Sequence, residues 1–166
     1  MKIKILPLVL VIIFLIIFLI FYKGLNNSNI YTPETNLKKD VPNFKTKIFN
    51  SKNIFEEDKF YLINIWSSWC GPCREEHPFL IKLSDQKNIK IIGLNYKDNI
   101  ENAKNFLREL NNPYEIILLD KDGTTSIELG AYGVPETFLI YKKKIIKKII
   151  GPLNENSYLK IKRLTG

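Results

Sequence analysis

The sequence predicts an α/β protein in which helices flank a mixed β-sheet, preceded by one N-terminal transmembrane helix. Three observations support this prediction. From residue 41 onward, short apolar runs alternate with longer segments of helical periodicity, the order typical of strand–helix–strand units. Two further apolar runs follow one another near the C-terminus and indicate adjacent strands. At the opposite end of the chain, 18 consecutive residues carry no charge.

The uncharged run, residues 5–22, predicts a membrane anchor. Lys2 and Lys4 precede it and Lys23 follows it, and about 18–20 apolar residues span the hydrocarbon core of a bilayer as a helix. A removed signal peptide is the alternative, but the following KGLNNSNIY offers no convincing cleavage site of small residues. The excess of lysine before the run places the N-terminus in the cytoplasm and the rest of the chain outside.

These patterns divide the chain into three segments: an anchor at 1–23, a polar tether at 24–40 and one globular domain at 41–166. The tether has few large apolar residues and is interrupted by Gly24 and Pro33. The remaining length suits a single domain with its own hydrophobic core.

Within the domain, the expected elements alternate in type. Five apolar runs are expected to form strands: 60–66, 89–96, 115–119, 136–142 and 144–151. A helix is expected to begin near Cys70. A second is expected at 99–112, where apolar residues recur on one face before Pro113. A terminal helix is expected at 154–164, with Asn154 as its N-cap.

The charge pattern gives little support to nucleic-acid binding. The formal net charge is +8, but only three of the basic residues are arginines and the lysines are spread along the chain. A nucleic-acid site would need a concentrated basic stripe, so we expect no such partner. The basic stretch at 142–148 is interpreted as a solvated strand edge, with contact to a membrane surface or a partner as the alternative.

The chemistry of this sequence is concentrated in WSSWCGPCREEHP, residues 66–78, which contains both cysteines and the only histidine. A structural zinc site needs four ligands, whereas the chain offers only Cys70, Cys73 and His77. A structural disulfide across so short a loop would constrain the unfolded chain very little. The sequence therefore favours a working redox pair, and we expect neither a metal nor a cofactor.

The position of the motif favours redox chemistry. A strand that ends at Trp66 and a helix that begins near Cys70 place the first sulfur at a helix N-terminus. Unpaired N–H groups and the positive end of the helix dipole favour a thiolate there. Cys73 follows one turn later on the same side, where its sulfur can attack a mixed disulfide.

Two titratable side chains follow on the same helical face, Glu76 and His77, while Glu75 points elsewhere. A carboxylate at Glu76 would accept a proton from the second thiol during exchange and raise the nearby thiol pKa values. The alternative is an ordinary exposed glutamate, and the spacing alone does not choose between the two. His77 precedes Pro78 and is interpreted as a surface residue of the helix rather than as a redox group.

The motifs, taken together, resemble the DsbE/CcmG family. The segments that carry the resemblance are LINIWSSWCGPCREEHPFL, IIGLNYKD, NPYEIILLDKDG and GAYGVPETFLIY, which occur in the family's order and spacing between about residues 41 and 153. Members of this family are membrane-anchored, thioredoxin-like thiol:disulfide interchange proteins of cytochrome c maturation. Two features depart from the family: the Gly-Pro dipeptide between the cysteines, and KKK after Tyr141.

The resemblance implies roles for individual residues. Cys70 would be the attacking sulfur and Cys73 the resolving one, which makes them the redox disulfide. The implied catalytic set is Cys70, Cys73, Glu76 and Glu136. The implied substrate-binding set is Trp69, Val134 and Pro135, in which Pro135 follows a cis peptide bond and faces the disulfide.

The resemblance also implies a function. We expect a thiol:disulfide oxidoreductase that is anchored in the inner (cytoplasmic) membrane by a single span, with its domain on the periplasmic side. Its expected substrate is a disulfide in apocytochrome c or in a maturation partner, and a membrane electron-donor protein would re-reduce it. The alternative is a general extracytoplasmic thioredoxin of the ResA/TlpA kind. A redox-inert binding module or a metallochaperone is the third interpretation.

Overall fold

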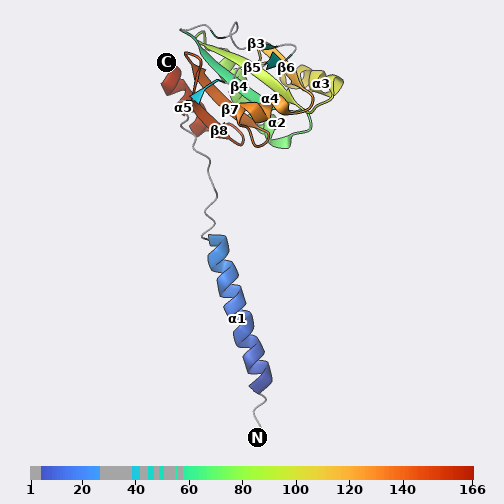
Figure 1. Ribbon diagram of the computed structural model, residues 1–166, viewed down its shortest axis with the longest axis vertical. Helices are drawn as coiled ribbons and strands as arrows, with labels where there is room; N and C mark the ends of the chain where they lie inside the picture. The colour runs from blue at the N-terminus through green and yellow to red at the C-terminus, as the bar shows by residue number, and fades with distance from the viewer. Residues whose placement is uncertain (1–4, 27–38, 42–44, 47–48, 51–54, 56–57) are drawn as a thin grey trace. The chain divides into compact units, whose positions relative to one another are not determined.

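The computed structural model describes residues 5–26, 39–41, 45–46, 49–50, 55 and 58–166. Two compact units are distinguished, Met1–Pro33 and Glu34–Gly166. The first contains one helix, α1 (Ile5–Asn26) (Figure 1). In α1 the structure describes the side chains of residue 7 and residues 9–23, all exposed. Within the described residues, no helix is long and apolar enough to cross a membrane.

The second unit is built on a mixed six-stranded sheet. Its strands are β1 (Lys39–Asp40), β4 (Phe60–Trp66), β5 (Ile89–Tyr96), β6 (Ile116–Asp120), β7 (Glu136–Tyr141) and β8 (Lys144–Ile150). In space the order is β1-β8-β7-β4-β5-β6. Strands β4, β5 and β6 run parallel, whereas β7 is antiparallel to β4, and β8 to β7. The five expected strands are confirmed. A separate two-stranded sheet pairs β2 (Lys45–Thr46) with β3 (Phe49–Asn50).

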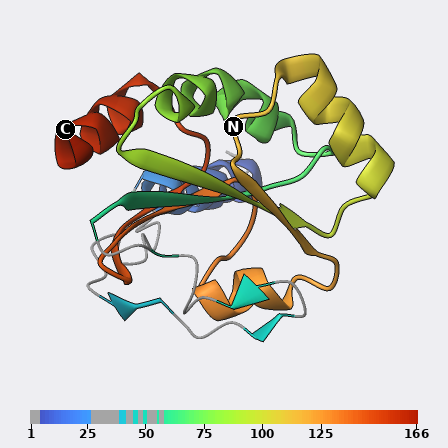
Figure 2. The same cartoon turned by 90° about the horizontal axis from the view of Figure 1, so that it is seen from above.

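Helices cover both faces of the sheet, as the sequence predicts. Figure 2 shows α2 (Gly71–Ser84), α3 (Ile100–Leu110) and α5 (Glu155–Thr165) on one face and α4 (Thr124–Leu129) on the other. Asn154 caps α5 as predicted, because its side chain accepts from the Ser157 N–H and the Ser157 hydroxyl accepts from the Asn154 N–H. Helix α4, which has 6 residues, was not predicted from the sequence.

The alternation of side chains along the central strands sorts residues between the two faces. On β4, Leu62 and Trp66 belong to the apolar cluster that contains both cysteines. Ile63 and Ile65 belong to the cluster on the α4 side. Asn64 alternates with Ile63 and Ile65 and therefore faces the helices α2, α3 and α5.

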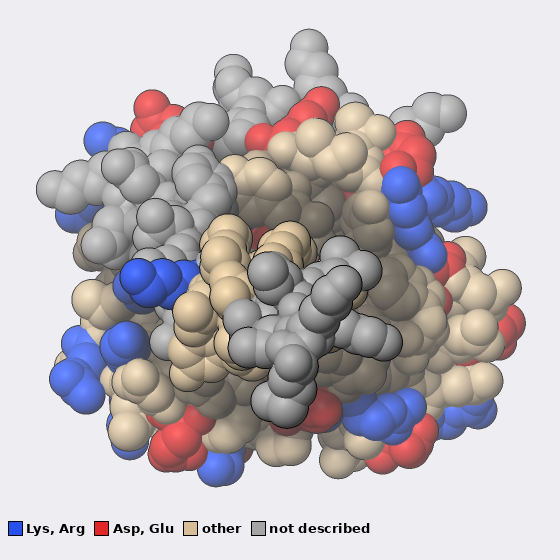
Figure 3. All heavy atoms as spheres, turned by 90° about the horizontal axis from the view of Figure 1, so that it is seen from below, with Lys and Arg blue, Asp and Glu red and all other residues tan. Residues whose placement is uncertain are grey.

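The basic hairpin between β7 and β8 adopts an unusual turn. Lys142 and Lys143 both have positive φ, 49° and 60°, a conformation that two-residue hairpin turns usually assign to Asn and Gly. The beginning of β8 is not a free edge, since β1 pairs with it at Lys144 and Ile145. On the face drawn in Figure 3, basic side chains are interspersed with acidic ones rather than gathered into one field.

Candidate active site

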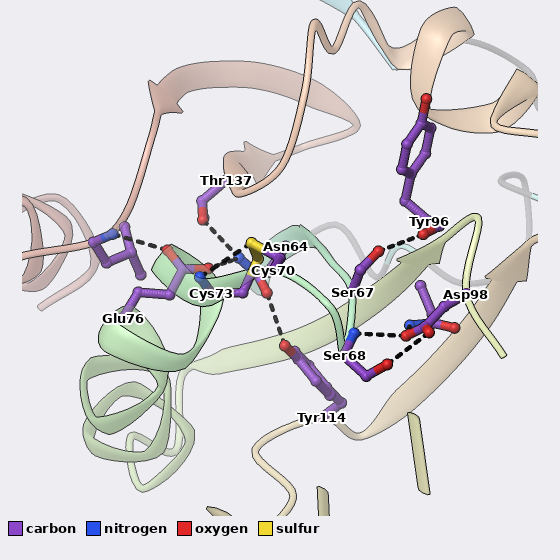
Figure 4. The surroundings of a disulfide bond; sticks show 12 residues. Asn64, Ser67, Ser68, Cys70, Cys73, Glu76, Tyr96, Asp98, Tyr114 and Thr137 are labelled. Atoms are coloured by element: carbon purple, nitrogen blue, oxygen red, sulfur yellow. Dashed lines mark hydrogen bonds between the residues drawn. A yellow bond between two sulfur atoms is a disulfide. The ribbon is translucent and has the colours of Figure 1, made fainter. Parts of the chain in front are cut away.

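The connection between β4 and α2 is fastened to the end of β5. The Ser67 hydroxyl donates to the carbonyl of Tyr96. The Ser68 N–H and hydroxyl both donate to the Asp98 carboxylate, at 2.6 and 2.7 Å. The Cys70 N–H closes the turn on the carbonyl of Ser67 at 3.2 Å. The loop that presents the first cysteine is therefore fixed by neighbouring parallel strands (Figure 4).

Cys70 and Cys73 form a disulfide at the start of α2, with an S–S distance of 2.06 Å. Cys70 is the N-cap of the helix, and its sulfur accepts from the Cys73 N–H at 3.1 Å. Pro72 occupies the first turn, where a missing N–H costs no hydrogen bond. The placement of the first sulfur at a helix N-terminus is confirmed, and the helix dipole favours a thiolate at that position.

The expected substrate-binding residues lie on two loops. Trp69 is 59% exposed, and its indole N–H donates to the Lys97 carbonyl at 3.2 Å. Val134 packs against the apolar cluster that contains both cysteines. The peptide bond between Val134 and Pro135 is cis, as the resemblance implies. The structure thus places Val134 against the disulfide's own packing cluster and leaves the Trp69 ring facing solvent.

Glu76 is a fully buried carboxylate one turn beyond Cys73. Its Oε1 accepts from the Asn64 side-chain amide at 2.8 Å, and its Oε2 accepts from the Leu153 N–H at 2.8 Å. Burial raises the pKa of Glu76 from 4.5 to about 7, against the lowering effect of those two hydrogen bonds. Figure 4 shows the carboxylate turned toward Asn64, beside the disulfide. The alternative of an exposed surface glutamate is therefore wrong.

A buried polar network links Glu76, through Asn64 of β4, to β7 and to the loop before β6. The Asn64 side-chain amide also donates to the Thr137 hydroxyl at 3.1 Å, and the Tyr114 hydroxyl donates to the side-chain Oδ1 of Asn64 at 2.8 Å. Burial is the larger cause that raises the pKa of Tyr114, and the charge of the nearby Glu76 is the smaller one. This network was not predicted from the sequence. Its signal was Asn64 itself, because a polar residue inside an apolar strand needs a buried partner.

His77 is buried rather than exposed, so the prediction of a surface residue is wrong. Its Nε2 lies 2.8 Å from the Asn111 carbonyl oxygen, and its ring meets Phe106 edge-on. His77 is buried because it lies on the same helical face as Cys73, and this face packs against α3 and the loop that follows α3. Burial lowers the pKa of His77. Within the described residues, no group of three or more potential ligands gathers to hold a metal ion.

Glu136 occupies a different environment from Glu76. Its Oε1 accepts from the N–H groups of Tyr132 and Gly133 at 2.9 and 3.2 Å, and its Oε2 lies 2.8 Å from the Lys148 ammonium. It pairs in register with Ile65 and precedes Thr137, so it lies on the α4 side of the sheet. The structure does not bring the two carboxylates together beside the sulfurs.

The fold and the disulfide at the start of α2 define a thioredoxin-like thiol:disulfide protein. The Redoxin family model matches residues 36–161. The thiol:disulfide interchange protein DsbE of Escherichia coli (strain K12) is 42% identical over 123 residues, covering 70% of this chain and 66% of that protein. DsbE of Pseudomonas aeruginosa is 40% identical over 149 residues, covering 86% of this chain and 82% of that protein. The chain therefore belongs to the Redoxin family and, within it, to the DsbE thiol:disulfide oxidoreductases.

Solved structures show the same fold. A Chlorobium tepidum protein described as a thiol:disulfide interchange protein DsbE superposes with a TM-score of 0.64 at 22% identity, covering 78% of this chain and 96% of its own. StoA from Bacillus subtilis gives a TM-score of 0.56 at 26% identity, covering 68% and 87%.

Proposed function

We propose that this protein is a membrane-tethered, extracytoplasmic reductant of protein disulfides, whose substrate is the disulfide of apocytochrome c or of a maturation partner. The observation that carries the proposal is the Cys70–Cys73 pair at the N-terminus of α2, with the buried Glu76 carboxylate one turn below it. The DsbE relatives support it, since they are named as thiol:disulfide interchange proteins.

The proposed reaction transfers two electrons to the substrate. The Cys70 thiolate attacks one sulfur of the substrate disulfide, which forms a mixed disulfide and releases the other substrate sulfur as a thiolate. Cys73 then attacks the Cys70 sulfur, releases the second substrate thiolate and leaves the Cys70–Cys73 disulfide. Because the compartment is oxidising, a membrane electron-donor protein re-reduces the pair.

Glu76 is proposed to accept the proton of Cys73 before the second attack. Its pKa of about 7 matches the range in which a general base works best near neutral pH. When ionised, the carboxylate also opposes the helix dipole and makes the thiolate less stable. A less stable reduced form makes the protein more reducing, which suits a donor of electrons.

Residues 5–22 are proposed to anchor the chain as a single span in the inner membrane, with residues 24–40 as the tether and residues 41–166 outside. The support comes from the sequence, which has 18 uncharged residues in a row. An alkylating reagent that cannot cross membranes should label reduced Cys70 in intact spheroplasts. Labelling that appears only after lysis would reverse the proposed orientation.

The Gly71–Pro72 dipeptide favours one alternative, a general ResA/TlpA-like reductant with other substrates, because ordinary thioredoxins have the same pair between their cysteines. Deletion of the gene separates the two. The proposal predicts a loss of haem-linked c-type cytochromes that added thiols restore, whereas normal cytochrome levels favour the alternative.

A trapping experiment tests the proposed substrate directly. In Cys73→Ser the second attack is removed, so the mixed disulfide between Cys70 and its substrate should accumulate. The matched control is Cys70→Ser with Cys73→Ser, which should trap nothing. Identification of an apocytochrome c or a haem-attachment protein in the trapped complex supports the proposal. A trapped set without such proteins contradicts it.

A further inference from the structure

Lys148 is a lysine of β8 with only 2% of its side chain exposed. Its ammonium lies 2.8 Å from the Glu136 carboxylate, donates to the Gly130 carbonyl at 2.8 Å, and lies 4.0 Å from the centre of the Tyr132 ring. A buried ammonium is costly unless it is paired and hydrogen-bonded. All three of these partners belong to one stretch of chain, from the end of α4 to the start of β7.

The same stretch of chain also contacts the Glu136 carboxylate through its backbone N–H groups. Glu136 accepts from the N–H groups of Tyr132 and Gly133, while Lys148 binds the carbonyl of Gly130, which caps the C-terminus of α4. The two charged side chains therefore fasten both ends of residues 131–135. We name residues 131–135 the docking loop.

The docking loop borders the disulfide on one side and solvent on the other. Val134 packs against the cluster that contains Cys70 and Cys73, and the Pro135 carbonyl accepts from the Gly151 N–H at 3.0 Å. The Tyr132 ring is 71% exposed. If a polypeptide disulfide contacts this loop on its way to the cysteines and a small disulfide does not, a change in the loop should affect only the polypeptide.

We infer that Lys148 is a positioning residue, which acts through Glu136 to hold the docking loop in the shape that receives an extended, disulfide-bearing polypeptide. The inference rests on the proposed function, because it takes a protein disulfide as the substrate. Lys148 touches no reacting atom. Its loss should therefore weaken recognition of a polypeptide disulfide and leave the intrinsic reactivity of the cysteine pair unchanged.

The test uses the reduced full-length chain in detergent with two probes: a synthetic peptide with an intramolecular CxxCH disulfide, and the small disulfide 5,5′-dithiobis(2-nitrobenzoic acid). Lys148→Met should raise the KM for the peptide about tenfold or more, the scale of a misplaced positioning group. Its rate with the small disulfide should stay within about twofold of the parent. Lys148→Arg, which keeps the charge, should restore the peptide KM. The matched control is Lys144→Met, an exposed lysine of the same strand, which should change neither rate.

Two further measurements keep the test decisive. Because Lys148→Met leaves a buried carboxylate unpaired, the double variant with Glu136→Gln removes both charges and preserves the fold. It should show the same rise in the KM for the peptide. Chymotrypsin should cleave after Tyr132 about tenfold faster in the double variant than in the parent, since local opening exposes the loop.

The possible outcomes separate the two proposals. An equal fall with both probes, or unchanged cleavage at Tyr132, overturns the role of Lys148. A parent protein that leaves the CxxCH peptide oxidised counts against the proposed function. In that case, cleavage at Tyr132 still decides whether Lys148 holds the loop.

Discussion

Two buried carboxylates of this domain, Glu76 and Glu136, lie on opposite faces of the sheet and have different kinds of hydrogen-bond partner. Glu76 has two neutral donors, the Asn64 amide and the Leu153 N–H. Glu136 has two backbone donors and, in addition, the Lys148 ammonium at 2.8 Å. Both are 1% exposed or less, so exposure does not distinguish them.

This difference shows how buried glutamates can serve either as a titrating group or as one half of an ion pair. Neutral donors offset only part of the cost of burying a charge, so Glu76 has a pKa of about 7 and can exchange a proton near neutral pH. A cation at hydrogen-bond distance makes Glu136 one half of an ion pair, for which we infer a structural role. Four predictions test this contrast, from the largest expected effect to the smallest.

The largest effect concerns the stability of the oxidised protein. Glu136→Gln leaves the Lys148 ammonium buried without its counter-charge and should lower the free energy of unfolding by about 3–5 kcal/mol. In Glu76→Gln the partners of the side chain are neutral, so the free energy of unfolding should fall by only about 1–2 kcal/mol, the cost of a poorly formed hydrogen bond. Urea denaturation at pH 6 measures both. Exposed Glu75→Gln is the control, and equal losses at the two buried sites would contradict the contrast.

The second effect is the dependence of stability on pH. The folded-state pKa of Glu76 is raised from 4.5 to about 7, so its stabilising contribution is complete below pH 4.5 and is lost as the pH rises toward 7. The expected loss is about 3 kcal/mol. His77 acts in the opposite sense, because its lowered pKa removes stability as the pH falls below 6.5.

Comparison with Glu76→Gln isolates the Glu76 contribution, since His77 is present in both proteins. The free energy of unfolding of the parent minus that of the variant should therefore fall between pH 4.5 and 7 and then level off. A difference that stays constant across this range would mean that Glu76 does not titrate there.

The third effect is on the rate at which Cys73 resolves a mixed disulfide. If Glu76 accepts the Cys73 proton, the rate should rise with pH up to about 7. Glu76→Gln should slow this step on the order of 100-fold, the lower end for general-base catalysis. The double variant Glu136→Gln with Lys148→Met should keep the parent's pH profile. Stopped-flow measurement on a preformed mixed disulfide with a small thiol gives the rates, and a parent-like profile in Glu76→Gln would remove the base from the mechanism.

Much of the fold could be predicted from the sequence because periodicity reports burial. The runs at 60–66 and 89–96 are the strands β4 and β5. The other three expected strands differ by one residue, at one end for β7 and β8 and at both ends for β6. Helix α4 escaped prediction because 6 residues between Gly123 and Gly130 are too short to show a periodic face.

Spacing alone predicted the site only where its residues are neighbours in sequence, whereas Val134 and Pro135 were predicted from the family resemblance. The spacing from Cys70 to Glu76 places them on one helical face, and the structure confirms this shared face. The contacts of Asn64 with Tyr114, which is 50 residues away, depend on the packing of separate strands. Lys148 belongs to the basic stretch that the sequence predicts to be exposed to solvent. Its burial depends on the register in which β8 pairs with β7.

The most direct test of the proposed role of Glu76 is the pKa of the Cys70 thiol in the reduced protein, measured from thiolate absorbance against pH. The account predicts that Glu76→Gln lowers this pKa by about one unit or less, the size of a single charge effect. The double variant Glu136→Gln with Lys148→Met should leave it unchanged, because the ion pair presents no net charge to the sulfur. An unchanged or higher Cys70 pKa in Glu76→Gln, or an equal fall in the double variant, would contradict the account.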